Sequence, residues 1–195
     1  MLDADSTIVT TDQFWSNMLS FGQSMVLLKA GGLSSQHISC MQQTPFWQLF
    51  DMYNQGCVSL NKHRKSDFDI VRIIKCYDVK TGTFVFGGKH VRLTPMWVSR
   101  IFGIPCSGDI IDITGKEDTT FSHVPSSVVK RGQLQKTSTE HSISMRLNHR
   151  EKPEIEKVTN LICLLICNTL FFPSTGTSIP WFIAKVLVNV DVMSK

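Results

Sequence analysis

The longest apolar segment of the chain runs from Leu161 to Phe172, with two polar residues near its end. A helix that spans a bilayer needs about 18 or more mostly apolar residues, so this segment of twelve residues is too short. It instead predicts a helix buried in a protein core. We expect this helix to cover 153–172, because Pro153 suits a first helical turn and Pro173 stops a helix. The rest of the chain must supply the partners that bury it.

The composition is that of an ordinary globular protein, with 195 residues of which 42% are hydrophobic and 18% are charged. These values exclude collagen-like, coiled-coil and wholly disordered chains, and the length predicts one domain or two small ones. The acidic amino terminus, residues 1–5, lacks the basic and then apolar pattern of a secretory signal. Six cysteines without a CxxC spacing predict reduced, mostly buried thiols in an intracellular protein with no membrane segment.

Hydrophobic residues recur at helical spacing over several further segments. Residues 1–34 predict an N-terminal helical segment that ends at Gly31 and Gly32. The stretch 35–54 predicts either one helix or two that divide at Pro45, since proline suits the first turn of a new helix. The predicted helices cover 11–28, 36–43, 45–54, 66–77, 94–102, 153–172 and 180–190.

Before the helix predicted over 94–102, the hydrophobic residues change to a spacing of two, which is typical of a strand. Residues 83–86 and 90–93 flank Gly87, Gly88 and Lys89, which predicts a short β-hairpin whose glycines supply the positive φ angles of the turn. The residues that follow predict a helix start at Thr94 and Pro95, with a stop at Gly103 before Pro105.

A polar stretch over 114–152 contains few large apolar residues and shows no sustained period. It predicts a long exposed loop or a partly disordered, flexible insert, with room for short helical patches. The sequence therefore predicts a mainly α fold with one small β-hairpin, over about residues 83–93, and a long polar insert.

Basic charge is concentrated in one part of the chain. Residues 1–56 carry one Lys and four Asp, a net charge of −3, whereas residues 57–100 carry nine Lys or Arg and three Asp, a net charge of +6. Such a cluster attracts nucleic acid by counterion release. It is also typical of a solvated surface, and 62–65 resembles a localisation signal. The residues assigned to a candidate nucleic-acid or partner surface are Lys62, Arg64, Lys65, Arg72, Lys75, Lys89 and Arg92.

No motif for catalysis, metal binding or phosphate binding emerges from the sequence. The six histidines form no HExxH or HxH pattern, and Gly87, Gly88 and Lys89 lack the spacing of a Walker loop. Cys163 and Cys167 share a helix face, but in an apolar run this indicates core packing. We therefore predict no catalytic residue, no metal and no cofactor.

The aromatic residues predict packing more than base stacking. The tryptophans fall within predicted helices and are expected to anchor the core: Trp15, Trp47, Trp97 and Trp181. A base-stacking surface interleaves exposed aromatics with Arg or Lys, a pattern approached by Phe84, Phe86, Lys89 and Arg92. Because alternate hairpin residues point to opposite faces, we expect these four residues not to share one surface.

Several motifs occur in the order found in one known family. They are Thr44-Pro45-Phe46-Trp47, Thr83-Phe84-Val85-Phe86, Leu93-Thr94-Pro95-Met96-Trp97-Val98, Phe102-Gly103-Ile104-Pro105-Cys106-Ser107-Gly108 and Leu170-Phe171-Phe172-Pro173. Together they resemble the plant mobile domain, over about residues 35–112 and 155–193. The family usually carries an acidic residue in the third of these motifs, where this chain has Trp97 before Val98.

The resemblance implies a mostly helical domain, and our leading hypothesis is a non-enzymatic interaction domain with nuclear protein or nucleic-acid partners. Such domains occur in plant transposable elements and in host proteins linked to transposon silencing, genome stability and meristem maintenance. Family domains are longer, so residues 35–195 are expected to be the amino-terminal part of one. The motif residues expected to have structural roles, in helix starts and turns, are Thr94, Pro95, Gly103, Pro105, Gly108 and Pro173.

Two other classes of function stay open. Family members are often labelled aminotransferase-like, which implies a pyridoxal-phosphate enzyme, although the Schiff-base lysine and phosphate cup of such an enzyme are not recognisable. An unrecognised thiol hydrolase is a second enzymatic alternative. The chain ends just after an apolar helix, so a third hypothesis is a gene fragment without a function of its own.

Overall fold

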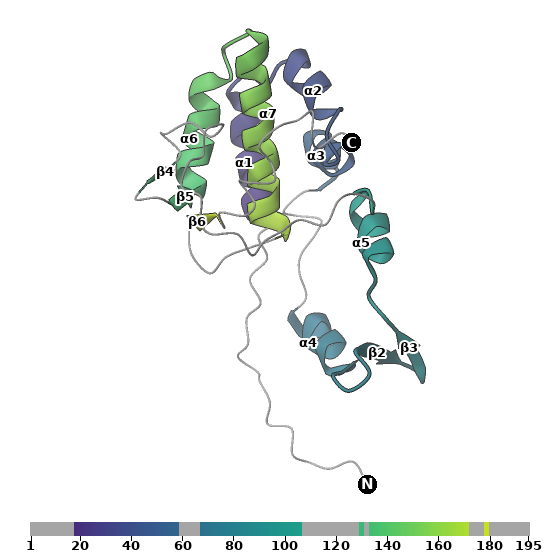
Figure 1. The fold of residues 1–195 in the computed structure, drawn as a ribbon. Coiled ribbons are helices and arrows are strands. Elements are labelled where there is room, and N and C mark those ends of the chain that lie inside the picture. The colour runs from purple at the N-terminus through teal and green to yellow at the C-terminus, as the bar shows by residue number, and fades with distance from the viewer. Residues whose placement is uncertain (1–17, 59–66, 107–128, 131–132, 172–177, 180–195) are drawn as a thin grey trace.

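The computed structural model describes residues 18–58, 67–106, 129–130, 133–171 and 178–179, and Figure 1 shows how its elements are arranged. The helices are α1 (Met18–Ala30), α2 (Ser35–Met41), α3 (Trp47–Asn54), α4 (Asp67–Lys75), α5 (Pro95–Phe102), α6 (Lys136–Arg146) and α7 (Lys152–Ile166), the last continued by a π-helical turn, Cys167–Phe171. The strands are β1 (Tyr77–Asp78), β2 (Thr83–Phe86), β3 (Lys89–Val91), β4 (Val129–Lys130), β5 (Gln133–Gln135) and β6 (Ser178–Ile179). The fold is mainly α, as the sequence predicts. None of the helices described here has the length and apolar character needed to cross a membrane.

Helix α7 lies at the centre of a bundle formed by α1, α2, α3, α6 and α7, which we call the bundle. Helices α2 and α6 pack directly against α7, and α1 packs against α6 and the π-helical turn. Figure 1 shows α6 beside α7, with α1 partly behind α7. Every residue from Leu161 to Cys167 is buried, and Phe21 and Phe50 fill the same core without any exposed surface. The prediction of a buried helix is confirmed as far as Phe171, with a π-helical last turn.

Local signals explain how the helices at the start of the bundle are divided. Ser34 precedes α2, and its hydroxyl accepts a hydrogen bond from the His37 backbone N–H at 3.5 Å. In return, His37 Nδ1 accepts a hydrogen bond from the Ser34 backbone N–H at 3.2 Å. This is a capping box in which His replaces the usual Glu or Gln. Pro45 separates α2 from α3, so the two-helix alternative for 35–54 is correct.

Helix α6 corrects the prediction of a long exposed insert over 114–152. Its residue Ile143 has no exposed surface, nor has Leu147 immediately after it. Thr139 and Ser142 are also buried, so small polar residues make up part of the packed face. Such a face leaves only a weak hydrophobic period, which explains why the sequence predicts no more than short helical patches here. Residues 107–128 lie outside the described ranges.

Residues 67–106, which we call the hairpin segment, contain α4, β1, β2, β3 and α5. Figure 1 shows α4 and the strands of this segment below the bundle and apart from α1, α6 and α7. The sheet order is β1-β2-β3 with antiparallel neighbours, so the predicted hairpin is confirmed and β1 adds a third strand. Gly87 and Gly88 have φ angles of 55° and 78°, the left-handed conformation that this turn requires. A second antiparallel sheet, β4-β5-β6, lies outside what the sequence predicts.

Helix α5 begins and ends where the sequence predicts. Thr94 is the N-cap residue, although its side chain makes no capping hydrogen bond, and Pro95 occupies the first turn. Gly103 ends the helix with a φ of 68°. Phe102 joins the helix to the bundle, because its ring centroid lies 5.0 Å from that of Phe171. Of the other motif residues, Pro105 is exposed after α5, and two lie outside the described ranges, Gly108 and Pro173.

Candidate functional site

The basic residues predicted to form a partner surface are partly within the described ranges. Three of them lie outside these ranges, namely Lys62, Arg64 and Lys65. The other four are exposed and belong to the hairpin segment: Arg72, Lys75, Lys89 and Arg92. Lys75 is the last residue of α4, just before edge strand β1, and Lys89 begins the opposite edge strand, β3. The small sheet thus has a lysine on or beside each of its edges.

The pairing of the strands decides which side chains share a face of this sheet. Tyr77 pairs with Phe84, Phe84 pairs with Val91, and Phe86 pairs with Lys89. Residues directly opposite in an antiparallel pair project to the same face, as do residues two apart on one strand. These five side chains therefore form one surface, which we call the aromatic face.

The aromatic face corrects the expectation that Phe84, Phe86 and Lys89 do not share a surface. A separation of two residues is one full period of a strand, so both phenylalanines project the same way. Their ring planes are 3° from parallel and their centroids lie 6.1 Å apart. Arg92 is different, since it follows Val91 by one position and its guanidinium donates to the Thr81 carbonyl oxygen at 3.1 Å.

The aromatic face is open to solvent in the described part of the chain. Tyr77 is 45% exposed, Phe86 is 42% exposed and Val91 is 39% exposed. Phe84 is half-buried beside them, with its ring centroid 4.9 Å from that of Tyr77. The strands pack chiefly against one another and not against the bundle. A contiguous group of exposed aromatic side chains is characteristic of a binding surface.

The opposite face of the sheet holds the Asp78 carboxylate in a polar turn. Asp78 pairs with Thr83 across β1 and β2, and Thr83 Oγ1 lies 3.0 Å from His90 Nδ1. The Asp78 carboxylate accepts hydrogen bonds from the Thr81 hydroxyl at 2.8 Å and from the Lys80 backbone N–H at 3.0 Å. These two hydrogen bonds lower the pKa of Asp78 below its usual value. The negative charge is therefore fixed away from the aromatic face.

Helix α5 presents a second exposed apolar surface. Its exposed hydrophobic residues, together with the residue before Thr94, are Leu93, Met96, Trp97, Val98 and Ile101. Trp97 is 48% exposed, with the Arg100 guanidinium 5.7 Å from its ring centroid, so the expectation that Trp97 anchors the core is wrong. Trp47 is half-buried and packs against the core. The other two tryptophans lie outside the described ranges, Trp15 and Trp181.

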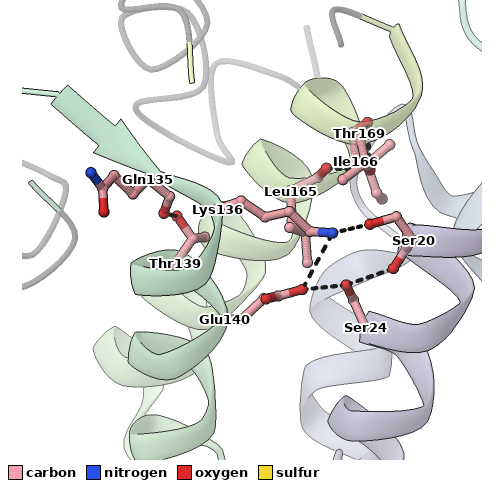
Figure 2. A network of polar contacts seen from close by, with 9 residues as sticks. All are labelled: Ser20, Ser24, Gln135, Lys136, Thr139, Glu140, Leu165, Ile166 and Thr169. Atoms are coloured by element: carbon pink, nitrogen blue, oxygen red, sulfur yellow. Dashed lines mark hydrogen bonds and ion pairs between the residues drawn. The ribbon is translucent and has the colours of Figure 1, made fainter. Parts of the chain in front are cut away.

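A polar network links α1 to α6 within the bundle, and Figure 2 shows its members. Lys136 Nζ donates to the Ser20 hydroxyl and lies 3.8 Å from a Glu140 carboxylate oxygen. The Ser24 hydroxyl lies 2.5 Å from the same carboxylate and 3.0 Å from the Ser20 carbonyl oxygen. The network satisfies polar groups between two helices and contains neither His nor Cys. We assign it a structural role, which the sequence did not reveal.

All six thiols are free, and two of them are buried, two are half-buried and two are exposed. Burial raises the pKa of Cys163 to about 12, and burial also raises the pKa of Cys167. Both thiols are therefore protonated near neutral pH and poor nucleophiles. Cys57 and Cys106 are exposed, so the prediction that the thiols are mostly buried is wrong. Within the described ranges, no three His, Cys, Asp or Glu side chains lie where they could hold a metal ion.

Comparison with known protein families identifies the family of this chain. The model of a family described as a domain of unknown function, DUF8566, matches residues 33–195. No curated protein and no solved structure matches the chain. The matched range includes the hairpin segment and all of the bundle helices except α1, which packs in the same core. Because this range covers more than half of the sequence, the chain belongs to the DUF8566 family.

Proposed function

We propose that this chain is a non-enzymatic interaction domain that binds nucleic acid through its basic segment, residues 62–100. The observation that carries the proposal is the aromatic face with lysines at both edges of its sheet. Nucleic-acid-binding surfaces combine basic residues that contact phosphates with exposed aromatic residues that contact bases. The hairpin segment offers both kinds of residue in one small structure.

Charge provides the long-range part of the proposed interaction. Residues 57–100 have a net charge of +6, whereas residues 1–56 have a net charge of −3. Contacts between lysine or arginine and phosphates release counterions, so the affinity falls as salt rises. Such binding tolerates many sequences, because phosphates are the same at every position.

The proposed cellular setting rests on the resemblance of the sequence motifs to the plant mobile domain. It places the domain in the nucleus, in a protein derived from a transposable element, with a role in transposon silencing, genome stability or meristem maintenance. Under this proposal the helical bundle is a scaffold and the hairpin segment is the part that meets the partner. No covalent chemistry and no cofactor are required.

The test is fluorescence anisotropy of labelled single- and double-stranded oligonucleotides with the whole chain, at several salt concentrations. We expect binding that weakens steadily as salt rises, and that weakens further when Lys62, Arg64 and Lys65 are replaced by Gln. The double variant Lys75→Gln and Lys89→Gln should also bind the oligonucleotides more weakly. As a control with equal loss of charge, Lys152→Gln and Lys157→Gln on α7 should change the affinity little. Absence of binding at low salt, or equal weakening by the control pair, would contradict the proposal.

The enzymatic alternative is tested on the same protein. A pyridoxal-phosphate enzyme forms a lysine Schiff base with its cofactor, which gives a visible absorbance band. We expect no such band after pyridoxal phosphate is added to the whole chain. A band that disappears when one particular lysine is replaced would favour the enzyme instead.

A protein partner is a second candidate, favoured by the exposed apolar surface of α5. Trp97 and Ile101 on this helix are 48% and 65% exposed. If α5 serves a protein partner alone, Trp97→Ala and Ile101→Ala leave the affinity for oligonucleotides unchanged. If α5 takes part in nucleic-acid binding, both substitutions weaken it.

A further inference from the structure

We propose that the aromatic face of the β1-β2-β3 sheet binds the unpaired bases of single-stranded nucleic acid. This inference rests on the proposed function and makes it more specific, because it names the form of nucleic acid and the residues that recognise it. Tyr77, Phe84 and Phe86 are the proposed base-stacking residues. Lys89, which pairs with Phe86 across the sheet, is the proposed phosphate contact.

The three rings form a continuous row across two strands. The Tyr77 and Phe84 centroids are 4.9 Å apart, and the Phe84 and Phe86 centroids are 6.1 Å apart with nearly parallel planes. Aromatic rings in such a row offer π surfaces to successive bases, which stack on them without regard to sequence. The outer two rings are also the exposed ones, at 45% for Tyr77 and 42% for Phe86. Tyr77 and Phe86 are therefore the two rings most accessible to a base.

The surroundings of the aromatic face favour a polyanion over an apolar protein surface. Lys89 lies on the face itself, and Lys75 precedes the edge strand β1. The nearby Asp78 belongs to the opposite face, where hydrogen bonds from Thr81 and Lys80 hold its carboxylate. Positive charge beside exposed rings, with the Asp78 carboxylate on the opposite face, complements the phosphates and bases of a nucleic-acid strand.

The single-stranded form follows from the geometry of stacking. In a duplex, the faces of the bases are covered by their neighbours in the helix, so only base edges and the backbone are accessible. Rings on an open sheet reach base faces only where the strand is unstacked, as in single strands, loops and bulges. A duplex can still be attracted by the basic charge, but it gains nothing from the rings.

The first experiment compares two probes with the whole chain. One is a fluorescein-labelled oligothymidylate of about 12 nucleotides, a length within the usual site size of a stacking surface. The other is its duplex with oligodeoxyadenylate. We expect the single strand to bind about tenfold or more tightly than the duplex at the same salt concentration, as expected when base stacking adds to phosphate contacts.

Substitutions then assign the difference to the aromatic face. Phe86→Ala should weaken single-strand binding about tenfold and leave duplex binding unchanged, since stacking acts on the single strand alone. Tyr77→Ala should act in the same direction. The matched control is Val85→Ala, on the same strand but the opposite face. Phe86→Trp should restore the affinity, and its fluorescence should be quenched when the oligothymidylate binds.

The outcomes separate this inference from the proposed function. If both probes bind equally, or if Phe86→Ala behaves like Val85→Ala, the aromatic face is not a base-stacking site, although nucleic-acid binding by the basic segment stands. That result would also be expected if the face binds a protein. If neither probe binds at low salt, both proposals fail. Circular dichroism of each variant shows whether the fold is kept.

Discussion

The bundle and the hairpin segment use their apolar residues in opposite ways. In the bundle, the apolar run of α7 is buried from Leu161 to Cys167. In the hairpin segment, Thr83 is the only buried residue among the described side chains. Of the fifteen large hydrophobic residues that are exposed in the described part of the chain, eleven lie within 73–101.

The difference separates residues that stabilise the fold from residues that are free to bind. A buried aliphatic side chain contributes about 1.5–3 kcal/mol by leaving water, and the bundle gains this many times over. The hairpin segment gains little of it, because its rings and its α5 side chains stay in contact with solvent. In the described part of the chain, Phe102, Gly103 and Ile104 connect the end of α5 to the bundle.

The largest expected effect is a difference in amide hydrogen exchange between the two regions. Amides of α7 should exchange only on global unfolding, which costs about 5–15 kcal/mol, whereas amides of α4 and β1–β3 should exchange through local opening. We expect at least about a thousandfold slower exchange in α7 than in the hairpin segment. Equal protection in both regions would mean that they unfold together, and the comparison would not hold.

Truncation of one large side chain in each region sharpens the contrast. Phe50 has no exposed surface, so Phe50→Ala should lower the free energy of unfolding by about 3–5 kcal/mol. Trp97 is 48% exposed, so Trp97→Ala should change it by about 0.5 kcal/mol or less. Urea unfolding followed by circular dichroism measures both values. A loss for Trp97→Ala comparable to that for Phe50→Ala would show that α5 contributes to the core.

The contact between the two regions can be tested at Gly103. A residue other than glycine in its left-handed conformation costs about 1–2 kcal/mol, and a Cβ there would clash with the Gln48 side chain, which would have to move. Gly103→Ala should therefore speed hydrogen exchange of the α5 amides. Gly88→Ala is the control, since Gly88 also has a positive φ, of 78°, but has no neighbour within 4 Å of its added Cβ. If both variants speed hydrogen exchange of the α5 amides equally, Gly103 does not hold the helix to α3.

The elements that the sequence predicts well are those with local signals at their ends. Pro45 divides α2 from α3, and Thr94, Pro95 and Gly103 define α5, because proline and glycine restrict or release the backbone whatever surrounds them. The hairpin turn at Gly87 and Gly88 belongs to the same group. At these positions, a few neighbouring residues are enough to determine the local structure.

The elements that the sequence misses depend on distant contacts. Helix α6 buries Thr139 and Ser142, and their burial comes from packing against α7, which a hydrophobic period does not report. In the aromatic face, strand periodicity alone places Phe84 and Phe86 on the same side, so this part of the site can be predicted from the sequence. The third ring, Tyr77, belongs to β1, a strand of two residues that is too short to show a hydrophobic period in the sequence. Helix α4, by contrast, is predicted over 66–77 and found at Asp67–Lys75, but Ile74 is 51% exposed because no described element covers it.

The smallest effect that we predict concerns His37 in the bundle and its response to pH. Burial, and then the positive charge of Arg150, lower the pKa of His37 below its ordinary 6.5. As the pH falls below about 6.5, the unfolded chain takes up a proton at this site before the folded protein does, so the bundle loses stability. Protonation would also place a proton on Nδ1, which accepts the hydrogen bond from the Ser34 backbone N–H. The urea concentration at the unfolding midpoint should therefore become lower as the pH is lowered from 8 to 5.

The variant that isolates this effect is His37→Gln, which keeps a hydrogen-bonding side chain at the third position of the capping box but removes the titration. It should be less stable than the unmodified chain at pH 8, and the difference should narrow toward pH 5. His141 is exposed on α6, so His141→Gln is a control that should follow the unmodified chain at every pH. A constant difference for His37→Gln across the range would show that His37 is not the group whose protonation destabilises the bundle. The hairpin segment contacts the bundle at Phe102, Gly103 and Ile104, which lie at and just after the end of α5 and not at the α2 cap. The His37→Gln substitution should therefore not alter how the affinity of the hairpin segment for nucleic acid responds to pH.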